Sequence, residues 1–77
     1  GDAMLDKFMK RWNDWMLSCG KHRAKAKQRP GQAMFNALHE FDRETAEKIR
    51  GTEYDPFYND ERIPVLLIHL TEIWKDR

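Results

Sequence analysis

The side chains with reactive chemistry in this 77-residue chain are one cysteine and three histidines. Cys19 and His22 lie close together in the sequence, whereas His39 and His69 belong to other segments. A zinc site needs four nitrogen or sulfur ligands at close spacing, and this scatter does not provide them. A Cys19–His22 nucleophilic pair would have no third orienting group and no oxyanion donor. We therefore expect a buried structural thiol, no metal ligands and no catalytic residues.

The other motifs of small active sites are also missing from the sequence. The acidic run at 52–61, TEYDPFYNDE, lacks the alternating oxygen ligands, the central glycine and the twelfth-position glutamate of a calcium loop. No glycine-rich loop that would cradle a phosphate is present. The expectation is a protein that is not an enzyme and that uses no cofactor.

Charge is distributed unevenly along the chain, although the formal net charge is only +1. Residues 1–30 carry eight Lys and Arg against three Asp, a net charge of +5. Residues 31–61 carry three basic and eight acidic residues, a net charge of −5. Polarised charge of this kind favours oriented association, either with a charged partner or with a second copy.

Cysteine usage and hydropathy indicate the compartment. A single unpaired cysteine predicts a reducing environment, most simply the cytoplasm. No apolar run approaches the roughly 20 residues that cross a bilayer, and no secretory signal is visible. We expect no contact with a membrane.

The first segment has the spacing of an amphipathic helix. Its apolar residues recur at intervals of three and four: Leu5, Phe8, Trp12, Trp15, Met16 and Cys19. Gly20 is expected to end this helix. The stripe is interpreted as a core face, with a docking surface as the alternative because two Trp and three Met are unusual in one short helix. Residues 1–3 precede the first methionine and are interpreted as a tag remnant outside the fold.

A basic segment follows, with the sequence KHRAKAKQR at 21–29. It either extends the first helix or forms a separate turn before Pro30. Such a run is more often a solvated face than a phosphate-binding one, and no aromatic residue interleaves with it to stack on bases.

Three further helices are predicted. The second covers 31–41 with Pro30 in its first turn, and Asp42 caps a third at 43–50 that Gly51 closes. The last runs from about residue 63 to 74, and its wide apolar face predicts the central position in the bundle. In the loop at 52–61, Phe57 is expected to plug the core, while Tyr54 and Tyr58 either join it or form an exposed aromatic patch. The fold class is a single all-α domain over 1–77, a compact bundle of three to four helices with a structured aromatic-acidic loop before the last helix.

Four short motifs lie in the last part of the chain. They are GQxxxNxL on Gly31, Gln32, Asn36 and Leu38; IRGT on Ile49 to Thr52; DPFYxD on Asp55 to Tyr58 and Asp60; and RIPxxL on Arg62, Ile63, Pro64 and Leu67. Through these motifs, the helical part at 30–77 resembles a widespread group of small bacteriophage and prophage proteins, whereas 4–29 form the amphipathic helix and the basic segment. The resemblance implies a viral setting and a helical fold but no catalytic residue, and it does not include the first 29 residues.

The expected function is binding of a host or phage protein, in the cytoplasm of a bacterial host, so as to alter its action. The expected anchors are mostly aromatic: Phe8, Trp12, Trp15, Met16, Tyr54, Tyr58 and Trp74. The alternative is nucleic-acid binding through the basic segment, with Lys21, Arg23, Lys25, Lys27 and Arg29 on the phosphates. A homodimer in which the first helices pair is compatible with either function.

Overall fold

The computed structural model describes residues 3–75 of the chain, with Ala26 described for its backbone alone. The elements are α1 (Ala3–Ala26), α2 (Pro30–Phe41), α3 (Arg43–Ile49), the 3-10 helix η1 (Asp60–Arg62) and α4 (Ile63–Lys75). No strand occurs within this described part, so the predicted all-α bundle with a structured loop before its last helix is confirmed. Of the residues interpreted as a tag remnant, Ala3 begins α1, and 1–2 lie outside the described range.

Helix α1 is longer than predicted. It does not end at Gly20 but continues to Ala26, so the basic segment extends the first helix. An interior glycine costs a helix only about 1 kcal/mol, and the lysines and alanines beyond it favour helix. The chain leaves the helical conformation at Lys27, whose φ of 52° lies in the left-handed region.

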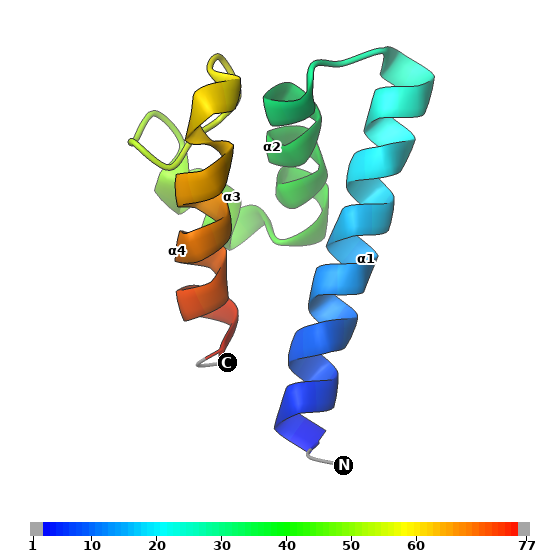
Figure 1. Ribbon diagram of the computed structural model, residues 1–77, viewed down its shortest axis with the longest axis vertical. Coiled ribbons are helices and arrows are strands. Elements are labelled where there is room, and N and C mark those ends of the chain that lie inside the picture. The colour runs from blue at the N-terminus through cyan, green and yellow to red at the C-terminus, as the bar shows by residue number, and fades with distance from the viewer. Residues whose placement is uncertain (1–2, 76–77) are drawn as a thin grey trace.

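The three long helices lie side by side, with α2 between α1 and α4 (Figure 1). Helix α2 contacts α1, α3 and η1, whereas α4 leaves Ile68 65% exposed on its outer side. The expectation that the last helix is central is therefore wrong, and α2 takes that place. None of the described helices is both long and apolar enough to cross a membrane.

Two tryptophans from opposite ends of the sequence form the centre of the core. Trp15 of α1 and Trp74 of α4 are buried, and their rings meet edge-on with centroids 5.7 Å apart. Both indole N–H groups are satisfied, because Trp15 donates to the Met34 carbonyl oxygen at 3.3 Å and Trp74 donates to the Asp42 carboxylate at 3.2 Å. Buried tryptophans normally need such partners, so these bonds fix how the helices meet.

The predicted boundaries of α3 are confirmed to within one residue. The Asp42 carboxylate accepts from the Thr45 backbone N–H at 3.3 Å, which is the expected N-cap bond. The helix ends at Ile49, and Gly51 follows with a φ of 76°, a conformation that glycine adopts without strain.

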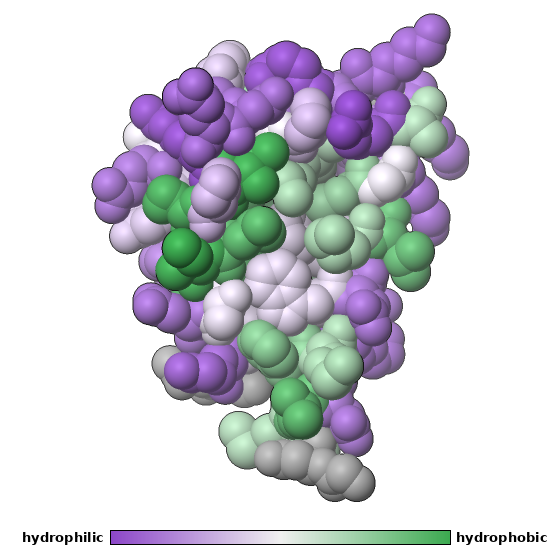
Figure 2. Space-filling view, viewed as in Figure 1, coloured by the Kyte–Doolittle hydropathy of each residue, from purple (hydrophilic) through white to green (hydrophobic). Residues whose placement is uncertain are grey.

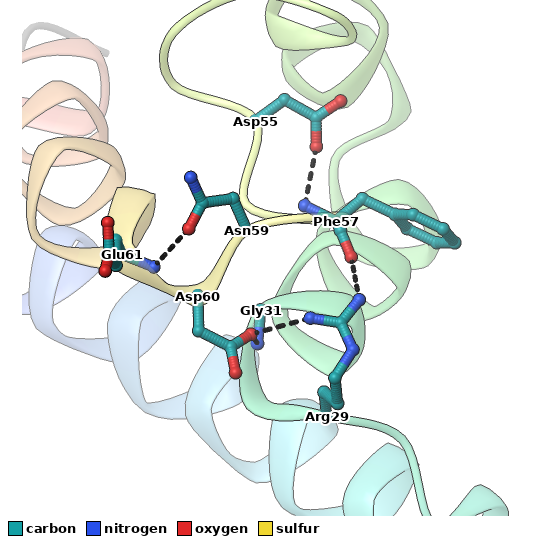
Figure 3. Close-up of polar contacts among 7 residues, drawn as sticks. All are labelled: Arg29, Gly31, Asp55, Phe57, Asn59, Asp60 and Glu61. Atoms are coloured by element: carbon teal, nitrogen blue, oxygen red, sulfur yellow. Dashed lines mark hydrogen bonds and ion pairs between the residues drawn. The ribbon is translucent and has the colours of Figure 1, made fainter.

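A polar link ties the start of α2 to the loop that precedes α4 (Figure 3). Arg29 donates to the Phe57 carbonyl oxygen at 2.6 Å and to the Asp60 carboxylate at 3.1 Å, and the same carboxylate accepts from the Gly31 N–H at 2.9 Å. Gly31 is needed there, because an added Cβ would collide with the Pro56 carbonyl oxygen. We call these contacts the Arg29–Asp60 link.

Candidate protein-docking surface

Exposed apolar side chains gather along α1. Met4 is 64% exposed, Leu5 is 52% exposed, and Met9 and Met16 are each 53% exposed. At about 100° per residue, the spacing of Leu5, Met9, Trp12 and Met16 by four, three and four places them in one row. This row lies beside the row that faces the core, which contains Phe8, Trp15 and Cys19. We call the exposed surface the α1 face; it consists of Met4, Leu5, Phe8, Met9, Trp12 and Met16.

The α1 face exists because α1 is twice as long as the helix it packs against. Helix α1 has 24 residues and α2 has 12, so the first turns of α1 project beyond the bundle (Figure 1). In the same view, green and pale side chains follow the lower part of α1 and the space between it and α4, with purple side chains on both sides (Figure 2). The surface is therefore apolar in the middle and polar at its margins, as docking sites commonly are.

Aromatic contacts hold the α1 face in position. The Phe8 ring meets Trp12 edge-on at 6.2 Å, and Trp12 meets the buried ring of Trp74 at 5.0 Å. Phe8 and Trp12 are half-buried, so each anchors the helix and still exposes part of its ring. A partner would meet an ordered surface and would lose little side-chain entropy on binding it.

The charges near the face are mostly positive. Lys7 and Arg11 lie one turn apart on the side of α1 that carries Met4, and neither forms an ion pair with a carboxylate of residues 3–75. Lys10 on the far side of the helix is paired with Asp14 at 2.7 Å. The edge of the α1 face therefore carries two cations that a partner carboxylate can meet.

The structure divides the predicted anchors among three places. Phe8, Trp12 and Met16 lie on the α1 face. Trp15 and Trp74 are 0% and 1% exposed, so they support the core and offer no surface to a partner, which corrects their assignment as anchors. Tyr54 and Tyr58 lie in the loop at 52–61, between α3 and η1.

The aromatic loop is partly core and partly surface. Phe57 packs against the core, as predicted, and meets Phe35 edge-on at 5.8 Å. Tyr54 stacks on the His69 ring with centroids 3.9 Å apart. Tyr58 is 86% exposed and contacts the ring of Phe57. Neither tyrosine belongs to the α1 face.

The basic segment is also divided. Lys21, Arg23 and Lys25 are exposed on the last turns of α1, and Lys27 is exposed in the connection to α2. Arg29 is engaged in the Arg29–Asp60 link, so it stabilises the fold. Lys21 and Lys25 therefore lie one turn apart on one side of the end of α1, and Arg23 lies on another side.

The sequence contained a signal for the part of the surface that the expected anchors omitted. Leu5 belongs to the predicted apolar stripe, and Met9 widens that stripe. Their spacing with Trp12 and Met16 forms a second helical row, and two adjacent rows are more than one neighbouring helix covers. The sequence does not reveal which row the bundle leaves uncovered.

The reactive side chains are held in structural contacts. Burial raises the pKa of Cys19 to about 12, which leaves the thiol protonated near neutral pH. His22 does not activate it, because its ring pairs with Glu40 at 3.1 Å. Within residues 3–75, no group of three or more His, Cys, Asp or Glu side chains could hold a metal ion.

Comparison with known proteins identifies no relative: no family model, no curated protein and no solved structure matches this chain. The function is therefore inferred from the surface of the chain itself.

Proposed function

We propose that this protein is a small non-enzymatic binding protein that docks a host or phage protein on its α1 face and alters the action of that protein. The observation that carries the proposal is the row of exposed apolar residues on α1, where Leu5, Met9 and Met16 are each at least half exposed. Contiguous exposed apolar surface with a polar rim is typical of protein interaction sites. The phage setting rests on the resemblance of residues 30–77.

The surface favours a helical partner with acidic residues. A helix carrying apolar residues at intervals of three and four matches the row on α1, as in other helix-to-groove interactions. Carboxylates on the part of the partner that covers Met4 would meet Lys7 and Arg11, which lie beside Met4 on the helix. Complementary charge of this kind sets the orientation and speeds association.

A second copy of the chain could occupy the α1 face in place of a different protein. Two α1 helices could pair through their apolar rows, but α1 carries six Lys and Arg against two Asp, a net charge of +4. Like charges repel across a helix pair, so pairing of two such helices is less favourable than pairing with an acidic helix.

Affinity capture from a bacterial host lysate, with matched variants, tests the proposal. The variant Leu5→Gln/Met9→Gln changes two residues of the α1 face, and Ile68→Gln is the control because Ile68 is an apolar residue of α4 that is 65% exposed. We expect the wild type and the control to recover the same specific protein, and the double variant to lose it.

Two outcomes would contradict the proposal. Recovery of no specific protein would contradict it, and so would equal recovery by the double variant. Analytical sedimentation measures whether the chain forms a dimer. If it does, and if the double variant is a monomer, the α1 face binds a second copy of the chain and not a different protein.

A further inference from the structure

A second site, separate from the α1 face, lies where the basic end of α1 meets α2 and the aromatic loop. Two depressions adjoin there, and both have His22 and Glu40 in their walls. The smaller has a volume of about 380 Å³ and the larger a volume of about 420 Å³. Volumes of this size are in the usual range for small-ligand sites.

The smaller depression is cationic. Lys21 and Lys25 line it from successive turns of α1, and neither has an ion-pair partner within residues 3–75. Among the described residues, Glu40 is the one carboxylate in its wall, and it is paired with His22 at 3.1 Å. Two unpaired ammonium groups one helical turn apart can bind a phosphate between them.

An unused polar atom in the same depression also points to a ligand. The side-chain Oε1 of Gln28 is buried and has no hydrogen-bond partner among the described residues. Buried polar atoms are normally paired, so one left unpaired calls for an explanation. Because the two ends of a glutamine amide can exchange by rotation, this side chain can turn its NH₂ group to a bound anion.

The larger depression is aromatic. Phe35 and Phe57, in edge-on contact at 5.8 Å, line it together with Tyr58, whose ring is 86% exposed. Asn36 and His39 add polar groups to the same wall. An exposed ring beside a depression of this kind can stack on a flat heterocycle, and the amide and imidazole can bond to the edge of that heterocycle.

We propose that the paired depressions bind a phosphorylated nucleoside, either free or as one unit of a single-stranded nucleic acid. Lys21 and Lys25 contact the phosphate, and Tyr58 with Phe57 stacks on the base. The sequence alone provided no aromatic residue beside the basic segment. The fold supplies it, because Tyr58 comes from a loop more than thirty positions away and lines the depression that adjoins the lysines.

The test measures binding of a short fluorescein-labelled single-stranded DNA by anisotropy, and of adenosine monophosphate by titration, at low salt. Two variants remove the proposed contacts, Tyr58→Ala and Lys21→Gln/Lys25→Gln. Tyr54→Ala is the aromatic control, and Lys7→Gln/Lys10→Gln removes the same charge from the other end of α1. Circular dichroism checks that each variant keeps its helical content.

We expect each site variant to weaken binding at least about tenfold and each control to weaken it less than about threefold. Binding of the DNA alone would assign the site to a strand, and binding of the mononucleotide as well would assign it to a free nucleotide. The inference would be overturned if neither probe bound, or if the controls weakened binding as much as the site variants. The Leu5→Gln/Met9→Gln variant should bind both probes normally, so this test is independent of the α1 face.

Discussion

Asp42 joins three helices through one carboxylate. It accepts from the Thr45 N–H at 3.3 Å, from the Thr45 hydroxyl at 2.7 Å and from the Trp74 indole at 3.2 Å. The residue between α2 and α3 thereby also holds α4 in place. A cap that was predicted from local sequence is therefore also a tertiary contact.

Asp42→Ala should lower the free energy of unfolding by about 2–4 kcal/mol. The loss of the cap costs about 1 kcal/mol, and the indole N–H left without a partner costs about 1–3 kcal/mol. Urea denaturation followed by tryptophan fluorescence measures the change. Asp42→Asn keeps an acceptor oxygen and should lose less; equal stability of the alanine variant and the wild type would show that these bonds contribute nothing.

Gly31→Ala should destabilise the fold, by about 1–3 kcal/mol, because the new Cβ would collide with backbone. Gly20→Ala is the matched control. A Cβ on Gly20 meets nothing within 4 Å, so this change should stabilise α1, by about 1 kcal/mol. Thermal unfolding by circular dichroism measures both, and a Gly31→Ala variant as stable as the wild type would refute the close approach of α2 to the loop.

Cys19 should be unreactive while the protein is folded. Because burial raises its pKa to about 12, little thiolate is present near neutral pH. Iodoacetamide labelling of the native chain should be at least about tenfold slower than labelling of the urea-unfolded chain. Equal rates would show that the thiol is accessible and ionised as in a free peptide.

At the scale of the helix, the two rows on α1 should differ in their contribution to stability. Leu5→Gln and Met9→Gln change half-exposed side chains, so each should change the free energy of unfolding by less than about 0.5 kcal/mol. Trp15→Ala empties a buried site and should cost about 3–5 kcal/mol. Urea denaturation checks both expectations; a large loss from the glutamine variants would mean that the α1 face belongs to the core.

The helices whose ends carry local signals could be predicted closely from the sequence. Pro30, Asp42 and Gly51 each have a side chain or backbone preference that acts on its own neighbours, so α2 and α3 were predicted to within one residue. The end of α1 was not, because a glycine such as Gly20 is only weakly unfavourable inside a helix. The helix ends instead beside Lys27, which adopts the left-handed conformation.

Contacts between distant segments could not be predicted in this way. The predicted apolar stripe contains both Leu5 and Trp15, yet Trp15 is buried and Leu5 is 52% exposed. Which part of the stripe is covered depends on the length of α2 relative to α1, and this is a property of the assembled bundle. The Arg29–Asp60 link was missed for the same reason, since its two residues are 31 positions apart.

At the scale of the whole molecule, the two proposed sites lie toward opposite ends of α1. The molecule measures 37 × 26 × 19 Å. The first turns of this helix project beyond the other helices and carry the apolar face, whereas its last turns carry the lysines beside the aromatic loop. The acidic segments follow on α2, α3 and the loop. This division gives the chain a positive helix and a negative body, so charged partners would meet it in a preferred orientation.

Hydrogen–deuterium exchange of the complex with the captured protein tests the docking claim most directly. In the free protein, the first turns of α1 lack a helical neighbour, so their amides should exchange rapidly compared with those of α2. The partner should slow exchange over residues 3–16 and leave the outer side of α4 unchanged. Protection confined to α4 or the aromatic loop, with α1 exchanging as before, would contradict the account.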